Sequence, residues 1–270
     1  MIAHLINTDV GRRGVLRLYL EYRRDNFNFL QKSARLLLDN CERTLIITGF
    51  GVPPHFIPET DGPPGALAIY RAVEALGGRA EILTYPEVEK AMEPLHVEFV
   101  RKPEPEDYSL VVAVETPGRA EDGKYYSMSG VEVKREGFDE KVMNARDAGI
   151  PTIGIGDGGN EVGMGNIHGL IKRHIPHGER IASTVEVDGL VLSAVSNWGA
   201  YGLVAEASVE TGKNLLRDWN EGAVVQLLTK GGLIDGVTKR REPSVDGIDL
   251  KVHEAIVELL KAILDESLGG

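Results

Sequence analysis

Short runs of aliphatic and β-branched residues alternate along this chain with longer segments of helical periodicity, and this alternation restricts the fold strongly. Residues 44–48 and 110–114 are uncharged and mostly apolar, which is typical of strands covered on both faces. Strands that alternate with helices favour an α/β fold, with a mainly parallel sheet flanked by helices. We therefore expect the ligand site at the C-terminal ends of the strands. Further strands are predicted at residues 80–84, 97–100, 151–155, 183–187 and 190–195.

The remaining segments predict helices. A long amphipathic helix is expected to begin near Gly14, and another at residues 66–76 follows a loop, 58–65, that is too rich in proline and glycine to be regular. The 270 residues, of which 42% are apolar, suffice for one large core or two modest ones. Because no repeat or disordered linker interrupts the pattern, we expect a single α/β domain over residues 1–270. Other helices are predicted at residues 137–148, 168–174, 203–211, 222–230 and 250–264.

Charge and composition narrow the classes of function. The chain has 30 Lys and Arg residues against 41 Asp and Glu, a formal net charge of -11, which argues against general nucleic-acid binding. Cys41 is the single cysteine, so an intrachain disulfide and a cysteine-rich zinc site are excluded. Without a signal-peptide pattern or an apolar stretch of bilayer length, we expect a cytoplasmic protein with a small-molecule substrate and no membrane partner. Homo-oligomer formation is left open.

A glycine-rich segment at residues 154–166, GIGDGGNEVGMGN, emerges from the strand predicted at 151–155. Its glycines match the G-x-G-x-x-G spacing of dinucleotide sites. Asp157 and Glu161, however, place negative charge where the phosphates of a dinucleotide would lie, so we expect no NAD. These acids favour a metal ion, an amine, or both. The structural alternative is a capped turn, in which Asp157 or Asn160 is the N-cap of the next helix and Glu161 lies near its positive end.

Polar side chains also follow three other predicted strands. Glu59 and Asp61 lie in the long connection after the first strand, where two nearby carboxylates suit a hard cation. The structural alternative is that Thr60 or Asp61 only caps the next helix. Glu115 ends a fully apolar strand, with a buried pair to Arg119 as the structural alternative. Asn197 lies in the turn after the last strand. Because parallel strands bring these ends to one edge, and close carboxylates repel unless they share a cation or a proton, we expect a Mg, Mn or Ca site.

Several blocks of the sequence together resemble the D-glutamate cyclase family, in its C-terminal-like domain. The most specific blocks are ETDGPPG at 59–65 and the block of glycines and acids at 154–165. The resemblance spans nearly the whole chain and implies the dehydration of D-glutamate to 5-oxo-D-proline. The supporting blocks are DVGRRG at 9–14, ETPGR at 115–119, SNWGAY at 196–201 and VDG at 245–247.

This lactam closure requires a neutral α-amine that attacks the γ-carboxylate carbon while one oxygen leaves as water. A general base must take the ammonium proton, and a Lewis acid or proton donor must make the carboxylate electrophilic. A cation held by carboxylates beside free acids supplies both functions. The residues assigned to these tasks are Glu115, Asp157 and Glu161 as catalytic groups, Glu59, Asp61, Asp157 and Glu161 as ligands of the metal or ammonium, and Arg12, Arg119, Asn160 and Asn197 as substrate-binding groups, with Arg12 or Arg119 holding the α-carboxylate.

Two other functions fit the same residues. The acids and a cation would serve a metal-dependent phosphatase or hydrolase of a small anionic metabolite, with arginines holding the phosphate. Arg12 or Arg13, placed before the first long helix, can reach such an anion or pair with surface acids. A non-catalytic sensor of a nucleotide or amino acid would keep the pocket without the chemistry. Incubation with D-glutamate, L-glutamate and a phosphoester, with and without divalent ions, separates the three functions.

Overall fold

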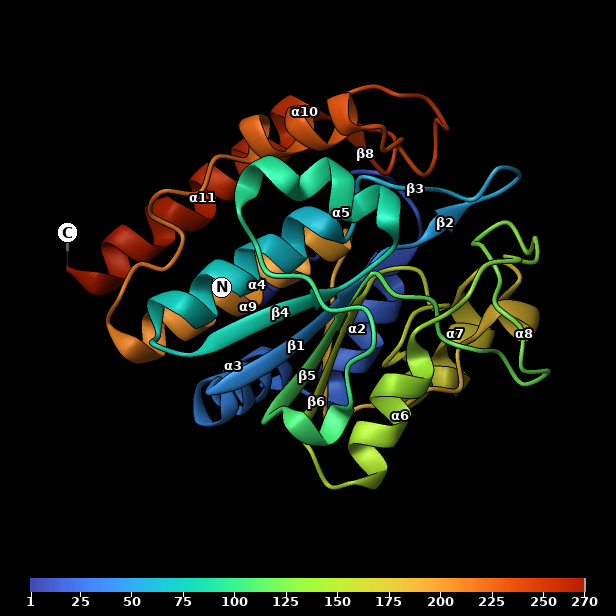
Figure 1. The fold of residues 1–270 in the computed structure, drawn as a ribbon, viewed down its shortest axis with the longest axis horizontal. Coiled ribbons are helices and arrows are strands. Elements are labelled where there is room, and N and C mark those ends of the chain that lie inside the picture. The colour runs from blue at the N-terminus through green and yellow to red at the C-terminus, as the bar shows by residue number, and fades with distance from the viewer. Residues whose placement is uncertain (270) are drawn as a thin grey trace.

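Five parallel strands form one sheet in the computed structural model, which describes residues 1–269 (Figure 1). Their spatial order is β4-β1-β5-β6-β7 and helices surround them, which confirms the predicted α/β fold. β5 and β6 are buried along their whole length, as expected of central parallel strands covered on both faces. The strands are β1 (Arg43–Thr48), β4 (Arg79–Leu83), β5 (Leu110–Val114), β6 (Thr152–Gly156) and β7 (Gly189–Leu192).

The chain reverses its direction of progress across the sheet between β1 and β5. It passes from β1 to β4 on one side, returns to β5 on the other side of β1, and continues outward to β6 and β7. Thr48 pairs with Val114, and Val114 pairs with Ile155, so the strands end nearly level. The loops that leave β1 and β5 therefore open at the carboxyl edge, where open α/β sheets hold ligands.

Helices pack on the sheet and on one another. α4 contacts β1 and β4, α9 contacts β6 and β7, and α6 contacts β5 and β6. α10 and α11, orange and red in Figure 1, run along one side of the molecule, where α11 packs on α9. The main helices are α2 (Val15–Asp25), α3 (Phe29–Asn40), α4 (Pro63–Ala75), α5 (Pro86–Met92), α6 (Asp139–Asp147), α7 (His168–His174), α9 (Ser196–Thr211), α10 (Glu221–Gly231) and α11 (Leu250–Leu268).

The shorter elements lie mainly at the ends of the sheet and in its connections. Four of them pair as two-stranded hairpins, β2-β3 and β8-β9. Every helix within residues 1–269 is too short or too polar to cross a membrane. The short elements are α1 (Ile2–Leu5), α8 (Gly178–Ile181), β2 (Gly51–Val52), β3 (Ile57–Pro58), β8 (Ser244–Val245), β9 (Ile248–Asp249) and the 3-10 turns η1 (Glu93–Leu95), η2 (Pro105–Asp107) and η3 (Met164–Ile167).

Two helices begin earlier than the sequence predicts. α4 begins at Pro63, inside the segment expected to be irregular. Proline has no amide hydrogen and a fixed φ, so it suits the first turn of a helix. α9 begins at Ser196 rather than near residue 203. Its first amides are capped by Asp61, which is distant in the chain, so the local sequence carries no start signal.

The long helix expected from Gly14 is in fact two helices, α2 and α3. Asn26 follows α2 with φ -129° and ψ 53°, outside the helical range. Its side-chain amide donates to the backbone oxygen of Tyr22 at 3.2 Å, which is the competing local bond that disfavours asparagine inside helices. The rings of Tyr22 and Phe29 then pack across the break, with centroids 5.2 Å apart.

Two predicted strands are wrong. Residues 97–100 make an isolated bridge, through Phe99 and Ile82, on the edge of the sheet. Residues 183–187 run as an irregular segment because their backbone groups bond to the glycine-rich loop. Val185 O accepts hydrogen bonds from two amides of that loop, at 2.9 and 3.0 Å. This segment therefore supports the loop instead of extending the sheet.

Candidate active site

A cluster of buried carboxylates lies beyond the carboxyl ends of β1, β5 and β6. Its six members are all less than a tenth exposed. They include two groups of three whose oxygens lie within 4.8 Å of one another, and both groups contain Asp157. We name them the first acid triad, Asp61, Asp157 and Asp246, and the second acid triad, Glu115, Asp157 and Glu161. Glu59, also buried, is the sixth member of the cluster and belongs to neither triad.

Arg13 is a cation inside the first acid triad. Its Nη1 lies 2.8 Å from Oδ2 of Asp157 and also contacts a carboxylate oxygen of Asp246. Burial alone would lower the pKa of Arg13, but the carboxylates of Asp157 and Asp246 raise it well above its usual value. The guanidinium is therefore charged, and it compensates part of the negative charge of the cluster.

One arginine does not balance this number of acids. Burial is the largest cause that raises the pKa values of Glu59, Asp61, Glu115 and Asp157 well above their usual range. Neighbouring carboxylates raise these pKa values further, because like charges at short range disfavour ionisation. Such a cluster is stabilised by protons or by an added cation, and oxygen ligands of this kind suit Mg²⁺, Mn²⁺ or Ca²⁺.

Asp61 is held at the amino end of α9. Its Oδ2 accepts a hydrogen bond from Ser196 N at 3.0 Å, and its Oδ1 accepts one from Asn197 N at 2.8 Å. In return, Oδ1 of Asn197 accepts from Gly62 N at 3.0 Å and from Gly65 N at 2.9 Å, at the start of α4. Each residue thus caps the other's helix, so Asp61 is fixed in position.

Both polar atoms of the Asn197 side chain bond to the loop before α4 and to the start of that helix. Its Nδ2 donates to Thr60 O at 3.1 Å, its Oδ1 serves the two amides of α4, and its side chain is fully buried. The substrate contact expected for Asn197 is therefore not supported by the geometry. Its position at the site is structural, because it orients the loop that carries Asp61.

Glu115 is held by the backbone and by one hydroxyl group. It follows β5 with φ +43°, in the left-handed region that is costly for a residue with a Cβ. Its Oε2 accepts a hydrogen bond from Ser196 Oγ at 2.6 Å. Gly62, at φ +96°, packs so closely that an added Cβ would lie 2.8 Å from Glu115 Cβ. The loops after β1 and β5 can approach this closely only because residue 62 is glycine.

Glu161 is bound by amides of its own loop. Its Oε1 accepts from Gly158 N and its Oε2 from Gly159 N, both at 2.7 Å. Gly159 has φ +107°, and an added Cβ would lie 2.6 Å from Ile171 Cγ2, which explains the glycine at that position. Amides arranged in this way hold phosphates in nucleotide sites. Here they hold the carboxylate of Glu161.

A small, partly open pocket leads to the cluster. It has a cavity volume of about 80 Å³, several times the roughly 15 Å³ that one water molecule needs. Its wall includes Arg13, Glu59, Glu115 and Asp246, with apolar contacts from residues such as Met128. Among the described residues, 1–269, Arg13 is the only positively charged side chain that lines the pocket. The pocket is therefore acidic, small, and suited to a ligand that carries positive charge or arrives with a cation.

Asn160 presents an unused acceptor in this pocket. Its Nδ2 donates to Tyr126 O at 2.7 Å, while its buried Oδ1 has no hydrogen-bond partner within residues 1–269. Asn160 is 2% exposed and lines the pocket. A buried acceptor without a partner costs free energy, so this atom suits a donor or a cation that a ligand brings.

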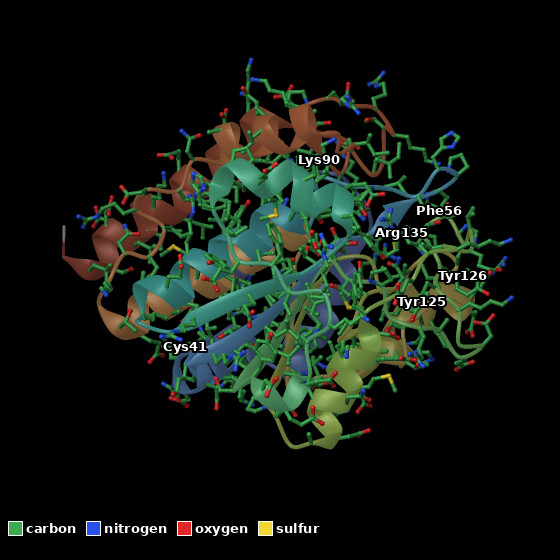
Figure 2. The ribbon with its side chains drawn as sticks, in the orientation of Figure 1. Cys41, Phe56, Lys90, Tyr125, Tyr126 and Arg135 are labelled. Atoms are coloured by element: carbon green, nitrogen blue, oxygen red, sulfur yellow. The ribbon has the colours of Figure 1, made fainter. Side chains whose placement is uncertain are left out.

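Two loops that each supply residues to the pocket wall, the β2-β3 hairpin and the loop after β5, also contact each other away from the pocket lining. Figure 2 shows Phe56, in the β2-β3 hairpin, close to Arg135 in the loop after β5. Nη1 of Arg135 donates to Phe56 O, and Nη2 lies 2.6 Å from Glu87 Oε2. The guanidinium also lies over the ring of Tyr85, 3.7 Å from its centroid. Arg135 therefore joins the β2-β3 hairpin to the loop after β5 and to the start of α5.

Within the part of the chain that the structure describes, neither of the two arginines predicted to bind the substrate, Arg12 and Arg119, reaches the acid cluster. Arg12 is exposed at the surface, whereas its neighbour Arg13 enters the cluster. Arg119 Nε lies 2.8 Å from Asp139 Oδ2, and Nη2 lies 3.2 Å from Glu140 Oε1. This pairing commits Arg119 to the start of α6, so it is not available to hold a substrate. Neither Arg12 nor Arg119 contacts the acid triads in the described residues.

The sequence reasoning missed Asp246 as a member of the site. Asp246 lies in the turn of the β8-β9 hairpin with φ +56°, outside the main sheet whose strand ends indicate the other acids. Asp235 holds that turn, because its Oδ2 accepts from Gly247 N and from Ser244 Oγ at 2.8 and 2.7 Å. The signal in the sequence was the VDG block at 245–247, which places an acid in a glycine turn.

Comparison with known proteins gives a family match over nearly the whole chain. Residues 2–261 match the family model described as D-glutamate cyclase-like, C-terminal. The mitochondrial D-glutamate cyclase of Homo sapiens is 36% identical over 235 residues, which cover 74% of this chain. The same alignment covers 37% of the human protein, so this chain corresponds to well under half of that relative.

Two solved structures show a weaker likeness. They are RecJ from Thermus thermophilus in complex with Mn²⁺ and the exonuclease RecJ bound to manganese, 13% and 14% identical, each with a TM-score of 0.39. They cover 76% and 75% of this chain, and the chain covers 24% and 42% of them. A likeness this low carries no argument about function or metal.

Proposed function

Since this chain belongs to the D-glutamate cyclase-like family, we propose that it is a hydro-lyase that closes D-glutamate to 5-oxo-D-proline with loss of water. The observation that carries this proposal is the small acidic pocket above two overlapping acid triads. The pocket offers acids that can accept protons from an ammonium group and oxygens that can hold a cation. Both are needed when an amine attacks a carboxylate.

The reaction moves two protons. The α-ammonium loses one proton and becomes a neutral amine, which attacks the γ-carboxyl carbon and forms the C–N bond. The nitrogen then loses its second excess proton as one C–O bond breaks. Both protons end on the departing oxygen, which leaves as water. The protein must therefore accept a proton from nitrogen and deliver protons to oxygen within one pocket.

Glu115 is our candidate for the general base. Its carboxyl group lines the pocket, and its Oε2 is oriented by the Ser196 hydroxyl at 2.6 Å. Burial and the neighbouring acids raise its pKa, which makes its carboxylate a stronger base than one in water. Glu59, which also lines the pocket, is the candidate that receives the substrate ammonium.

Asn160 and Arg13 are our candidates for substrate binding. Oδ1 of Asn160, which has no hydrogen-bond partner in the part of the chain that the structure describes, can accept a hydrogen bond from the ammonium. Arg13 lines the pocket and takes the place that the sequence assigned to Arg12 or Arg119 as the group that holds the α-carboxylate. Asp157 and Glu161 remain proposed site acids, with Asp157 shared by both triads.

A divalent cation fits the donor set. Three carboxylate oxygens lie within 4.8 Å of one another in each triad, and oxygen ligands are those that Mg²⁺, Mn²⁺ and Ca²⁺ prefer. We propose that Asp61, Asp157 and Asp246, together with Glu161 of the second acid triad, hold this ion. When bound, it would neutralise charge and polarise the γ-carboxylate as a Lewis acid.

The test is a product assay with D-glutamate, L-glutamate and a generic phosphoester, each with Mg²⁺, Mn²⁺, Ca²⁺ or chelator. We expect 5-oxoproline from D-glutamate, detected by chiral chromatography, and little from L-glutamate. Glu115→Gln should abolish the product, while Glu186→Gln, which alters an exposed acid outside the pocket, should not. Phosphate release without 5-oxoproline would favour a hydrolase instead. Ligand-dependent stabilisation without any product would favour a sensor.

A further inference from the structure

Arg13 is paired with two carboxylates that a divalent cation would need as ligands. Its Nη1 contacts Asp157 and Asp246, two of the three members of the first acid triad. The two acids are 2% and 5% exposed at their side chains, against 18% for Arg13. The guanidinium thus reaches in from the surface and ends among carboxylates that are almost wholly buried.

The backbone that delivers Arg13 is a surface turn rather than a core element. Asp9 accepts hydrogen bonds from Arg13 N at 2.8 Å and Gly14 N at 3.0 Å. The neighbours of Arg13 in this turn are exposed, and a Cβ built on Gly14 would meet nothing within 4 Å. The turn anchors the backbone of Arg13, while its long side chain extends from this surface turn to the buried acids and is itself 18% exposed.

Two cations cannot share these oxygens at no cost. An ion held by the first acid triad would lie next to the guanidinium in a buried setting, where like charges repel strongly. It would also take lone pairs that now accept from Arg13 Nη1. Asp157 belongs to both triads, so a cation bound in the second triad meets the same competition. Asn160, which lines this pocket, has a buried Oδ1 without a hydrogen-bond partner within residues 1–269, so a ligand that brings a donor or a cation would satisfy it.

We propose that Arg13 and a divalent cation exchange at Asp157 and Asp246, and that the released guanidinium becomes the carboxylate-binding group of the pocket. This inference rests on the proposed function, because it orders its steps. Arg13 compensates part of the charge of Asp157 and Asp246 while the ion is absent. When the ion replaces it, Arg13 stays tethered by Asp9 beside the pocket that it already lines. The α-carboxylate of the substrate is then bound after the ion, not before it.

The direct test is a calorimetric titration of Mn²⁺ alone into wild type, Arg13→Gln and Arg12→Gln. Arg12→Gln is a matched control, because it removes the same charge from an exposed neighbour on the same turn. We expect Arg13→Gln to bind Mn²⁺ at least tenfold more tightly than wild type, and Arg12→Gln to stay within about twofold of it. Equal affinity of the two variants, or weaker binding by Arg13→Gln, would overturn the exchange.

A second measurement uses the wild-type protein and needs no variant. Phenylglyoxal labels accessible arginines, and mass spectrometry of the peptide that holds both residues compares Arg13 with Arg12. Addition of Mn²⁺ should increase labelling of Arg13 several-fold while labelling of Arg12 stays constant. Labelling of Arg13 that is insensitive to saturating Mn²⁺ would overturn the exchange even if Arg13→Gln does not fold.

The exchange and the proposed function fail separately. Suppose that the wild-type protein forms 5-oxoproline while Arg13→Gln binds Mn²⁺ no better than Arg12→Gln does. That result would overturn the exchange and leave the proposed cyclase function standing. If Arg13→Gln binds Mn²⁺ more tightly but wild type forms no product from D-glutamate, the exchange stands and the proposal that D-glutamate is the substrate is overturned. Absence of Mn²⁺ binding by wild type and Arg13→Gln alike would overturn the exchange.

Discussion

Asp61 and Asn197 cap each other's helices across the mouth of the sheet. The carboxylate of Asp61 accepts from the first amides of α9, and the amide oxygen of Asn197 accepts from Gly62 N and Gly65 N at the start of α4. The positions of the two helices are therefore coupled to the position of a proposed metal ligand. Stability and activity should respond together when this pair is broken.

Asn197→Ala tests that coupling. It removes three buried hydrogen bonds and should lower the free energy of unfolding by about 2 to 4 kcal/mol. Denaturant titration gives the stability, and the cyclase assay should show a loss beyond the unfolded fraction, because Asp61 loses its support. Asn144→Ala, at an exposed position in α6, should change stability by less than about 0.5 kcal/mol. A stable and fully active Asn197→Ala protein would contradict the coupling.

Gly62→Ala tests the close approach of the loops after β1 and β5. The added Cβ would lie 2.7 Å from Thr48 Oγ1 and 2.8 Å from Glu115 Cβ, at φ +96°. We expect a loss of about 3 kcal/mol or more, from backbone strain plus steric overlap. Gly77→Ala is the matched control, since Gly77 has φ +91° but nothing within 4 Å, and should cost about 1 kcal/mol. Equal losses in thermal or denaturant unfolding would show that the contact is unimportant.

Glu115→Gln and Glu161→Gln should separate chemistry from support. Glu115→Gln should lower kcat by about 100-fold or more, as expected for loss of a general base, with little change in folding. Glu161→Gln places an amide nitrogen against Gly158 N or Gly159 N, which now donate to carboxylate oxygens. It should therefore reduce stability by about 1 to 3 kcal/mol as well as activity. Steady-state kinetics beside denaturant unfolding distinguish the two, and full activity of Glu115→Gln would reject its role.

Chelation tests the proposed cation. A ligand that binds only the folded state at about 100 times its Kd adds roughly 2.7 kcal/mol of stability. Saturating Mn²⁺ or Mg²⁺ should thus raise Tm by several degrees, and chelator should reverse the shift and abolish product formation. Asp157→Asn should lose the shift, because Asp157 belongs to both acid triads. If chelator and added ions change neither Tm nor activity, the cation must be given up.

Glu221 predicts a pH dependence of stability that lies away from the proposed site. Its Oε2 accepts from Tyr201 Oη at 2.5 Å and Trp219 Nε1 at 3.0 Å. Burial raises its pKa from the usual 4.5 to about 7. The folded state then binds the proton more tightly than the unfolded state, so stability falls as pH rises from about 4.5 to 7, by roughly 3 kcal/mol from this group.

Glu221→Gln should remove that part of the slope. Because other buried acids in this chain change stability in the same direction, the quantity to measure is the difference between wild type and variant at each pH. The variant should be relatively more stable at pH 7 than at pH 4.5. A difference that stays constant across this range would show that Glu221 does not titrate there.

Local patterns were enough for the sheet and for much of the acid cluster. The apolar runs that became β1, β5 and β6 needed only burial on both faces, and acids beyond parallel strands meet because the strands end level. The proposed chemical roles of the acids remain predictions that the assays above test.

Long-range contacts account for what the sequence did not predict. The start of α9 depends on Asp61, which is 135 residues away from Ser196. The choice of Arg13 over Arg12 depends on the turn that Asp9 closes, with Arg12 at φ +54° and directed to the surface. Asp246 enters through a hairpin outside the main sheet. None of these relationships leaves a periodic signal in the sequence.

The amides of the glycine-rich loop form an anion-binding site, and the carboxylate of Glu161, from the same loop, already fills it. This carboxylate is joined covalently to the amides that bind it, only two and three residues away, and such tethering corresponds to an effective concentration on the order of millimolar or more. Free phosphate and phosphorylated metabolites must compete with that tethered group. The loop should therefore resist inhibition by the anions that glycine-rich loops ordinarily attract, and selectivity against them is built into the chain itself.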